Sequence, residues 1–247
     1  SYTGDQGFKL IDVKNGKCSM ETFAAQLSAI DLKCMITGEG PSSQKTRPGC
    51  VGAFGGVTSD LAHFGIPVVC LADGPSGIRM DNGDPATSMP NGTLIACSWD
   101  IEAAEKLYEY ASIELCTHHI DSLLGPGINI HRSPLNGRNF EYLSEDPYLT
   151  GKMGAALVRG MNKYGNTATV KHFAVNSQEL CRRDVVSTVS ERALREIYLK
   201  GFEMTVKEGG VKAIMTSYNP INERWSAQNY DLTTIILREE WGYNGFV

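Results

Sequence analysis

Basic residues are in the minority in this 247-residue sequence, and long apolar runs are absent from it. Lysine and arginine number 23 against 28 aspartates and glutamates, which leaves a formal net charge of −5. Without a basic excess or a block of like charges, the chain has no electrostatic basis for binding nucleic acid or an anionic membrane surface. No apolar stretch approaches the ~20 residues that a membrane-spanning helix needs. Neutral or weakly charged small molecules are therefore the expected partners.

Grouped metal ligands are also missing. The seven cysteines stand singly, with no CxxC pair, at Cys18, Cys34, Cys50, Cys70, Cys97, Cys116 and Cys181. Because their number is odd and their spacing irregular, we expect reduced, buried thiols and a cytoplasmic protein. An upstream signal peptide stays open, since residue 1 is not methionine. Neighbouring helical residues point ~100° apart, so His118 and His119 are not expected to chelate together, and neither a metal site nor a cofactor is predicted.

What the sequence does contain is a repeated pattern of short β-branched runs, each followed by an amphipathic helical stretch. The expected strands are residues 66–72, 120–124, 168–172 and 211–217, and another begins at residues 245–247. Helices are expected over residues 19–35, after an N-cap at Ser98, over residues 150–164 before a left-handed Gly165, after an N-cap at Ser190, and from Asp231 to Gly242. Residues 38–56, rich in glycine, proline and serine, are expected to form a loop, either a surface connection or a lid.

This pattern predicts an α/β fold built from parallel βα units. About four and a half units are present, and an eight-stranded barrel closes only when strand number and stagger match. We therefore expect an incomplete (β/α)8 TIM-like barrel that contains about the first half of its βα units.

Polar residues follow the expected strands, where parallel βα folds place their ligand sites. Asp73 follows the first strand, Lys171 and His172 end the third, and Tyr218 follows the fourth. Such groups together can donate and accept hydrogen bonds to several neighbouring hydroxyls, as a pyranose ring requires. A phosphate ligand is disfavoured, because no Gly-rich phosphate fingerprint follows a strand and Asp73 would repel an anion.

Each of these residues also has an ordinary structural explanation. Asp73 could form a turn before Gly-Pro, Arg138 a surface ion pair, and His172 a satisfied core histidine. Their occurrence at successive strand ends favours one shared site over separate explanations.

Four long motifs make the sequence similar to a known family. They are LADGPSGIR (71–79), GPGINIHRSPLNGRNFEYLSEDPYLTG (125–151), VKHFAVNSQELCRRD (170–184) and AIMTSYNPIN (213–222). Together they resemble the barrel domain of glycoside hydrolase family 3, in its β-glucosidase branch. The resemblance implies hydrolysis of terminal, non-reducing β-D-glucosyl or related β-glycosyl residues with retention of configuration. The third motif lacks the KHFPGHG-type string of the β-N-acetylglucosaminidase members, which favours the β-glucosidase branch.

The resemblance also assigns substrate-binding roles by position. Asp73 matches an aspartate that holds distal hydroxyls of the non-reducing sugar, and Arg138 matches the arginine of the GRN motif. Lys171 and His172 match a pair that reaches the same ring, and Arg182 a further arginine near it. The positions that match residues beside the nucleophile are Met215 and Tyr218.

No catalytic residue is assigned within the chain. The resemblance places the nucleophile in an SDW or TDW string directly after residues 245–247, and the acid/base carboxylate on a separate domain. The acidic residues left unassigned are Glu141, Glu145, Asp146, Glu179 and Asp184. Of these, Glu179 is expected to pair with Arg182 or Arg183, and residues 145–147 to form a turn that leads into a helix. The chain alone is accordingly expected to be inactive.

The expected domain organisation is a linker over residues 1–18, from an upstream domain, followed by the N-terminal part of the barrel over residues 19–247, which stops before the nucleophile. An α/β sandwich domain would precede the barrel, or follow its missing half as in the usual order. The expected partners are a β-linked glucoside or oligosaccharide and the other domains of the same enzyme, and a homo-oligomer stays open. A non-catalytic sugar-binding or scaffold fragment is the alternative, and a phosphate-utilising glycosidase is a third hypothesis.

Overall fold

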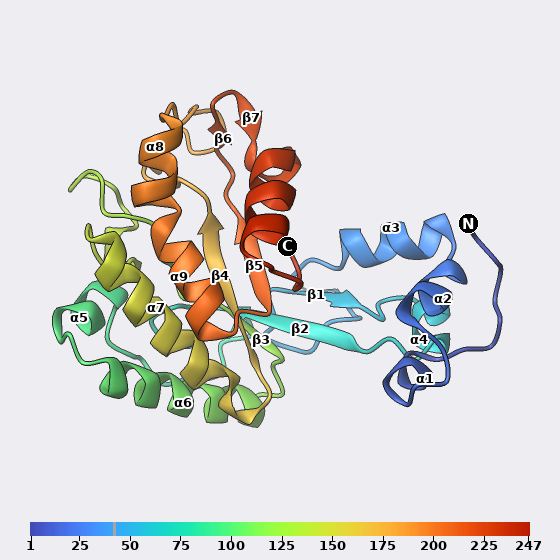
Figure 1. The fold of residues 1–247 in the computed structure, drawn as a ribbon. Helices are drawn as coiled ribbons and strands as arrows, with labels where there is room; N and C mark the ends of the chain where they lie inside the picture. The colour runs from blue at the N-terminus through green and yellow to red at the C-terminus, as the bar shows by residue number, and fades with distance from the viewer. Residues whose placement is uncertain (42) are drawn as a thin grey trace. The chain divides into compact units, whose positions relative to one another are not determined.

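A computed structural model describes residues 1–41 and 43–247, which fall into two units (Figure 1). The first comprises Ser1–Ala72 and Met80–Pro85, and the second comprises Asp73–Arg79 and Ala86–Val247. Within the described residues, no helix is both long and apolar enough to cross a membrane.

Among its described residues, the first unit contains a buried apolar cluster and four short helices. They are α1 (Leu10–Lys14), α2 (Met20–Ala25), α3 (Ala29–Thr37) and α4 (Ser59–His63). The buried cluster consists of Phe23, Leu27, Leu61, Phe64 and Ile66. The expectation of one helix over residues 19–35 was wrong. The Ser28 hydroxyl accepts a hydrogen bond from the backbone N–H of Asp31, and this N-cap begins a second helix.

A pair of antiparallel strands also belongs to this part of the chain. β1 (Gly52–Gly55) pairs with β2 (Val68–Asp73), and Gly52 lies opposite Leu71. β2 confirms the first expected strand and ends at Asp73. β1 contradicts the expectation that all of residues 38–56 form a loop, a segment whose residue 42 lies outside the described residues. Its sequence, GAFG, contains no β-branched residue and so lacks the usual composition of a strand.

The second unit is built on parallel strands. β3 (Ser122–Leu124) pairs with β4 (Thr167–Phe173), and β4 pairs with β5 (Ala213–Thr216). Phe246 forms a parallel bridge to Ala213, as expected of a strand that begins at residues 245–247. The parallel pattern predicted for these strands is therefore confirmed.

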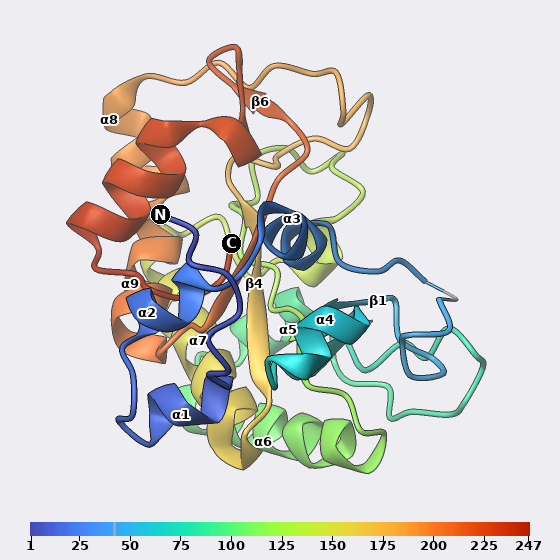
Figure 2. The ribbon, with the colours of Figure 1, turned by 90° about the vertical axis from the view of Figure 1, so that its right-hand side faces the viewer.

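Three longer helices lie side by side along this sheet (Figures 1 and 2). They are α6 (Ile101–Thr117), α7 (Pro147–Met161) and α9 (Lys200–Gly209), and α7 contacts both of the others. The remaining elements of the unit are α5 (Gly92–Cys97), η1 (Asn139–Glu141), η2 (Asn162–Tyr164), α8 (Glu191–Ala193), η3 (Leu194–Tyr198), β6 (Pro220–Ile221), β7 (Arg224–Trp225), η4 (Ser226–Gln228) and η5 (Asp231–Glu240).

Helix ends agree with the sequence at some positions and not at others. Ser190 caps α8 and Gly165 is left-handed with φ of 90°, as predicted. The N-cap of α6 is Asp100 instead of Ser98, because the Asp100 carboxylate accepts from the N–H of Ala103. The helix expected from residue 150 begins earlier, at Pro147, where Asp146 supplies the cap and proline needs no hydrogen-bond acceptor for its nitrogen.

All seven cysteines are reduced thiols, as their spacing predicts. The expectation that they are buried was wrong for Cys97, Cys116 and Cys181, which are exposed. Cys97 ends α5 and Cys116 lies in the last turn of α6, whereas Cys181 belongs to the loop after β4. These positions face solvent and not the core.

Candidate functional site

A cleft of about 850 Å³ in the second unit brings together the side chains that follow the strands. Its lining includes all seven residues predicted to bind substrate, namely Asp73, Arg138, Lys171, His172, Arg182, Met215 and Tyr218. They come from the end of β2, the loop before η1, β4 and the loop after it, and the end of β5. Residues that lie far apart in the sequence therefore share one cavity.

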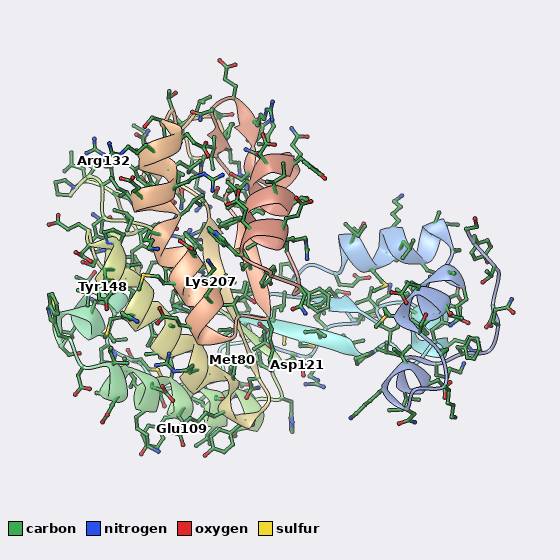
Figure 3. The ribbon with its side chains drawn as sticks, viewed as in Figure 1. Met80, Glu109, Asp121, Arg132, Tyr148 and Lys207 are labelled. Atoms are coloured by element: carbon green, nitrogen blue, oxygen red, sulfur yellow. The ribbon has the colours of Figure 1, made fainter. Side chains whose placement is uncertain are left out.

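Not every polar residue that follows a strand reaches this cleft. Arg132 follows β3 in the sequence, but its side chain is exposed and does not line the cavity, and Figure 3 shows it on the outer side of the unit. Asn219 follows β5, but its side-chain amide is buried and donates to the carbonyl of Ala174, 3.3 Å away. Position after a strand is thus insufficient for a place in the cleft.

The Asp73 carboxylate and the Lys171 ammonium, two of the predicted residues, form an ion pair with each other in the cleft. Lys171 Nζ lies 2.8 Å from Asp73 Oδ1, and the N–H of Gly74 donates to the same oxygen at 2.9 Å. Arg79 Nη1 lies 3.4 Å from Asp73 Oδ2. Burial acts to raise the pKa of Asp73, but Lys171, the Gly74 N–H and Arg79 outweigh it and hold that pKa below its ordinary value. Asp73 is therefore an ionised hydrogen-bond acceptor at neutral pH.

A second carboxylate, Glu141, also lies close to Lys171. It is buried and forms an ion pair with the Nε of Arg138, and its Oε2 is 4.0 Å from Lys171 Nζ. Burial acts to lower the pKa of Arg138, but the hydrogen bond to Glu141 dominates and that pKa is raised. The alternative explanation of Arg138 as a surface ion pair is wrong, because its partner is buried.

His172 is fixed by its backbone as well as by its ring. Its N–H donates to Asn129 Oδ1 and its carbonyl accepts from Asn129 Nδ2, both at 2.8 Å. The ring lies edge-on to that of Tyr142, with centroids 6.0 Å apart. Burial lowers the pKa of His172 far below its ordinary value, and the charges of Arg138, Lys171 and Arg182 lower it further. The imidazole is therefore neutral.

Tyr218 forms part of the cleft's mouth. The guanidinium carbons of Arg182 and Arg183 lie 5.0 and 5.3 Å from the centre of its ring. Arg182 also forms a 2.9 Å ion pair with Glu179, which confirms the pairing expected for that carboxylate. Contact with the two cations orients the phenol ring before any ligand arrives.

Sequence reasoning missed several residues that support the predicted ones. Glu141 was left unassigned, and Tyr142 and Asn176 were not singled out at all. Glu141 follows Arg138 by three residues, on the single turn of η1, and this spacing is the signal that could have found it. No local pattern indicates that Tyr142 would lie against His172, since the two come from different elements.

The arrangement is suited to a ligand with many hydroxyl groups. Asp73 accepts hydrogen bonds, Lys171 and Arg138 donate them, and Met215 and Trp225 add apolar surface to the lining. Among residues 1–41 and 43–247, no three His, Cys, Asp or Glu side chains are grouped so that they could hold a metal ion.

Comparison with known proteins places this geometry in context. Residues 35–247 match the model of the glycosyl hydrolase family 3 N-terminal domain. A β-glucosidase of Ruminococcus albus is 51% identical over 246 residues, which are 100% of this chain and 26% of that protein. The chain therefore spans about a quarter of the length of this relative.

The chain is also similar in fold to solved structures of β-glucosidases. A β-glucosidase from Paenibacillus barengoltzii has a TM-score of 0.96 and 62% identity, covering 98% of this chain and 26% of its own. β-Glucosidase 3B from Thermotoga neapolitana, solved in complex with α-D-glucose, has a TM-score of 0.84 and 38% identity, covering 92% of this chain and 33% of its own.

Proposed function

This chain belongs to glycosyl hydrolase family 3, and we propose that it forms the sugar-binding wall of an enzyme that hydrolyses terminal, non-reducing β-D-glucosyl residues. The observation that carries the proposal is the convergence of the seven predicted side chains on one cleft. Its fold is consistent with this role, because the parallel strands and flanking helices of the second unit are part of a TIM-like barrel, which places ligands at the carboxyl ends of its strands.

The ion pairs of the cleft would orient the sugar before chemistry begins. Lys171 lies close to both Asp73 and Glu141, so the donor and acceptor groups are held in place without a ligand. A glucosyl ring would then exchange its hydrogen bonds with water for bonds to groups that need no reorganisation. Such positioning would support a reaction whose transition state has oxocarbenium character.

We assign the reaction a retaining mechanism, in which a carboxylate attacks the anomeric carbon and a carboxylic acid roughly 5 to 5.5 Å away protonates the leaving oxygen. The nucleophile is placed after residue 247 of the intact enzyme, and the acid on another domain. Phe246 pairs in parallel with Ala213, which supports this placement. A continuation of that strand would run beside Met215 towards Tyr218 at the mouth of the cleft.

The proposal is tested by Asp73→Asn in the intact enzyme. The amide keeps the shape of the carboxylate but removes the charge that Lys171 and a sugar hydroxyl share. Glucose affinity, measured by titration calorimetry, is expected to fall on the order of 10- to 100-fold, and turnover of an aryl β-glucoside to fall with it.

Glu208→Gln is the matched control, because Glu208 pairs with Lys152 at 2.7 Å on α9, outside the cleft lining. It should leave both measurements unchanged. Unaltered glucose affinity and turnover in Asp73→Asn would contradict the proposal. Glucose binding without turnover in the parent enzyme would favour the non-catalytic alternative.

A further inference from the structure

A row of hydrogen bonds runs from the mouth of the cleft to the buried side of His172. We call it the Tyr142 relay, and its members are Arg182, Glu179, Asn176, Tyr142 and His172. Arg182 Nη1 lies 2.9 Å from Glu179 Oε2, and Asn176 Nδ2 lies 3.1 Å from Glu179 Oε1. Asn176 Nδ2 also lies 2.9 Å from Tyr142 Oη, which is 3.0 Å from His172 Nδ1.

The direction of each hydrogen bond follows from the chemistry of the partners. The Glu179 carboxylate, paired with Arg182, can only accept, so the Asn176 amide must turn its NH₂ group towards it. The two N–H bonds of that group are then committed to Glu179 and to Tyr142. The Tyr142 oxygen therefore accepts from Asn176.

The proton of the Tyr142 hydroxyl has one acceptor within reach. The residue is fully buried, and in the described part of the chain its hydroxyl contacts Asn176 and His172. Because Asn176 donates, it cannot accept this proton. A buried hydroxyl proton without an acceptor costs about 1 to 3 kcal/mol, and His172 Nδ1 avoids that cost by accepting it. His172 Nδ1 is thus the acceptor at the end of the relay.

An imidazole whose Nδ1 accepts is neutral and carries its proton on Nε2. Burial and the charges of Arg138, Lys171 and Arg182 act in the same sense, because all of them disfavour imidazolium. His172 lines the cleft, and no residue of 1–41 and 43–247 forms a hydrogen bond with its Nε2. That N–H is left for a ligand.

We propose that Tyr142 is a positioning residue that fixes His172 as an Nε2–H donor to the bound sugar. This inference rests on the proposed function, because it states which hydrogen bond the substrate must accept in the site. The sugar hydroxyl next to His172 must accept a hydrogen bond from Nε2–H. The proton of that hydroxyl must be donated to another acceptor, such as Asp73. Arg182, at the other end of the relay, also contacts the ring of Tyr218 in the cleft lining.

The test compares the parent enzyme with Tyr142→Phe, both as the intact protein. Phenylalanine keeps the buried ring but removes the hydroxyl that donates to His172 Nδ1. Long-range ¹H–¹⁵N NMR of histidine-labelled protein reports which ring nitrogen carries the proton, and His172→Gln identifies the resonances. In the parent, His172 is expected to carry its proton on Nε2 and none on Nδ1. In Tyr142→Phe, this tautomer is expected to be no longer the only one.

Glucose affinity is the second readout. In Tyr142→Phe it should fall on the order of tenfold, the scale of one misdirected buried hydrogen bond. Tyr243→Phe is the matched control, because Tyr243 is also buried and donates its hydroxyl proton to the carbonyl of Phe246 outside the cleft lining. It should change neither the histidine spectrum nor glucose affinity.

A parent spectrum with the proton of His172 on Nδ1 would overturn the inference, even if the Tyr142 variant failed to fold. An unchanged spectrum and unchanged affinity in a folded Tyr142→Phe would overturn it as well. The spectrum is recorded without sugar, so it stays decisive if the parent binds no glucose and the proposed function itself fails.

Discussion

Lys171 is the residue on which the electrostatics of the cleft depend. Its ammonium group is almost fully buried, 2.8 Å from Asp73 and 4.0 Å from Glu141. Moving such a charge out of water costs several kcal/mol unless opposite charges lie close to it. The two carboxylates supply them, and in return Lys171 holds Asp73 ionised where a sugar would bind.

His172 should make stability depend on pH in a defined range. Its pKa is lowered from 6.5 in the folded protein, so the unfolded chain binds a proton that the folded one excludes. Stability therefore falls as pH drops below about 6.5, with a slope of up to about 1.4 kcal/mol per pH unit from this residue. Urea denaturation of the parent and of His172→Gln, from pH 7.5 down to about 4.5, measures the difference.

The stability advantage of the parent over His172→Gln should shrink steadily through that range. Asp73 does not interfere, because its pKa lies below 3.8 and its contribution is lost only at lower pH. If the unfolding free energies of the two proteins changed with pH in parallel, the conclusion that His172 stays neutral would be contradicted.

At single positions, the sequence allowed prediction of the residues that follow strands but not of those that support them. Asp73, Lys171 and His172 could be predicted because each directly ends or follows an apolar run. Tyr142 could not, because its role arises from a contact with His172 on β4, 30 residues away in the chain, whereas Glu141 was overlooked although it lies three residues after Arg138. Long-range contacts of this kind leave no local pattern.

Helices α6 and α7 of the second unit pack closely because a glycine lies at their contact. Gly160 on α7 lies against α6, and a Cβ atom there would be 2.2 Å from the carbonyl oxygen of Glu105. The same helix buries most of its residues between α6 and α9. This close approach lets α7 cover β4, the strand that carries Lys171 and His172.

Gly160→Ala should therefore destabilise the protein. Relief of the clash requires the two helices to separate, which is expected to cost about 1 to 3 kcal/mol in the free energy of unfolding. Thermal or urea denaturation measures it, with Gly137→Ala as control, since a Cβ at Gly137 meets nothing within 4 Å. Equal stability of the two variants would show that the α6–α7 contact is looser than described.

The elements themselves were predictable where periodicity was strong. The parallel strands β3, β4 and β5 are short apolar runs, and the helices between them carry long apolar stripes, although α7 begins at Pro147 and not at residue 150. The break between α2 and α3 was missed because residues 19–35 keep their apolar spacing across the Ser28 cap. β1 was missed because it is stabilised by pairing with β2 and not by its own composition.

At the scale of the whole molecule, membership in glycosyl hydrolase family 3 agrees with the α/β fold and with the cleft. The residues described here span about a quarter of the R. albus β-glucosidase, and hydrolysis by this protein stays a proposal. The division into a linker over residues 1–18 and a barrel over residues 19–247 stays a prediction, as do the cytoplasmic location and the oligomeric state.

The central claim is that the seven predicted side chains hold the sugar, and a crystal structure of the intact enzyme with bound glucose tests it most directly. We expect the ring in the cleft, with hydroxyls within hydrogen-bond distance of the Asp73 carboxylate, Lys171 Nζ and His172 Nε2. Glucose bound elsewhere, or in the cleft with none of these three groups in contact, would contradict the account.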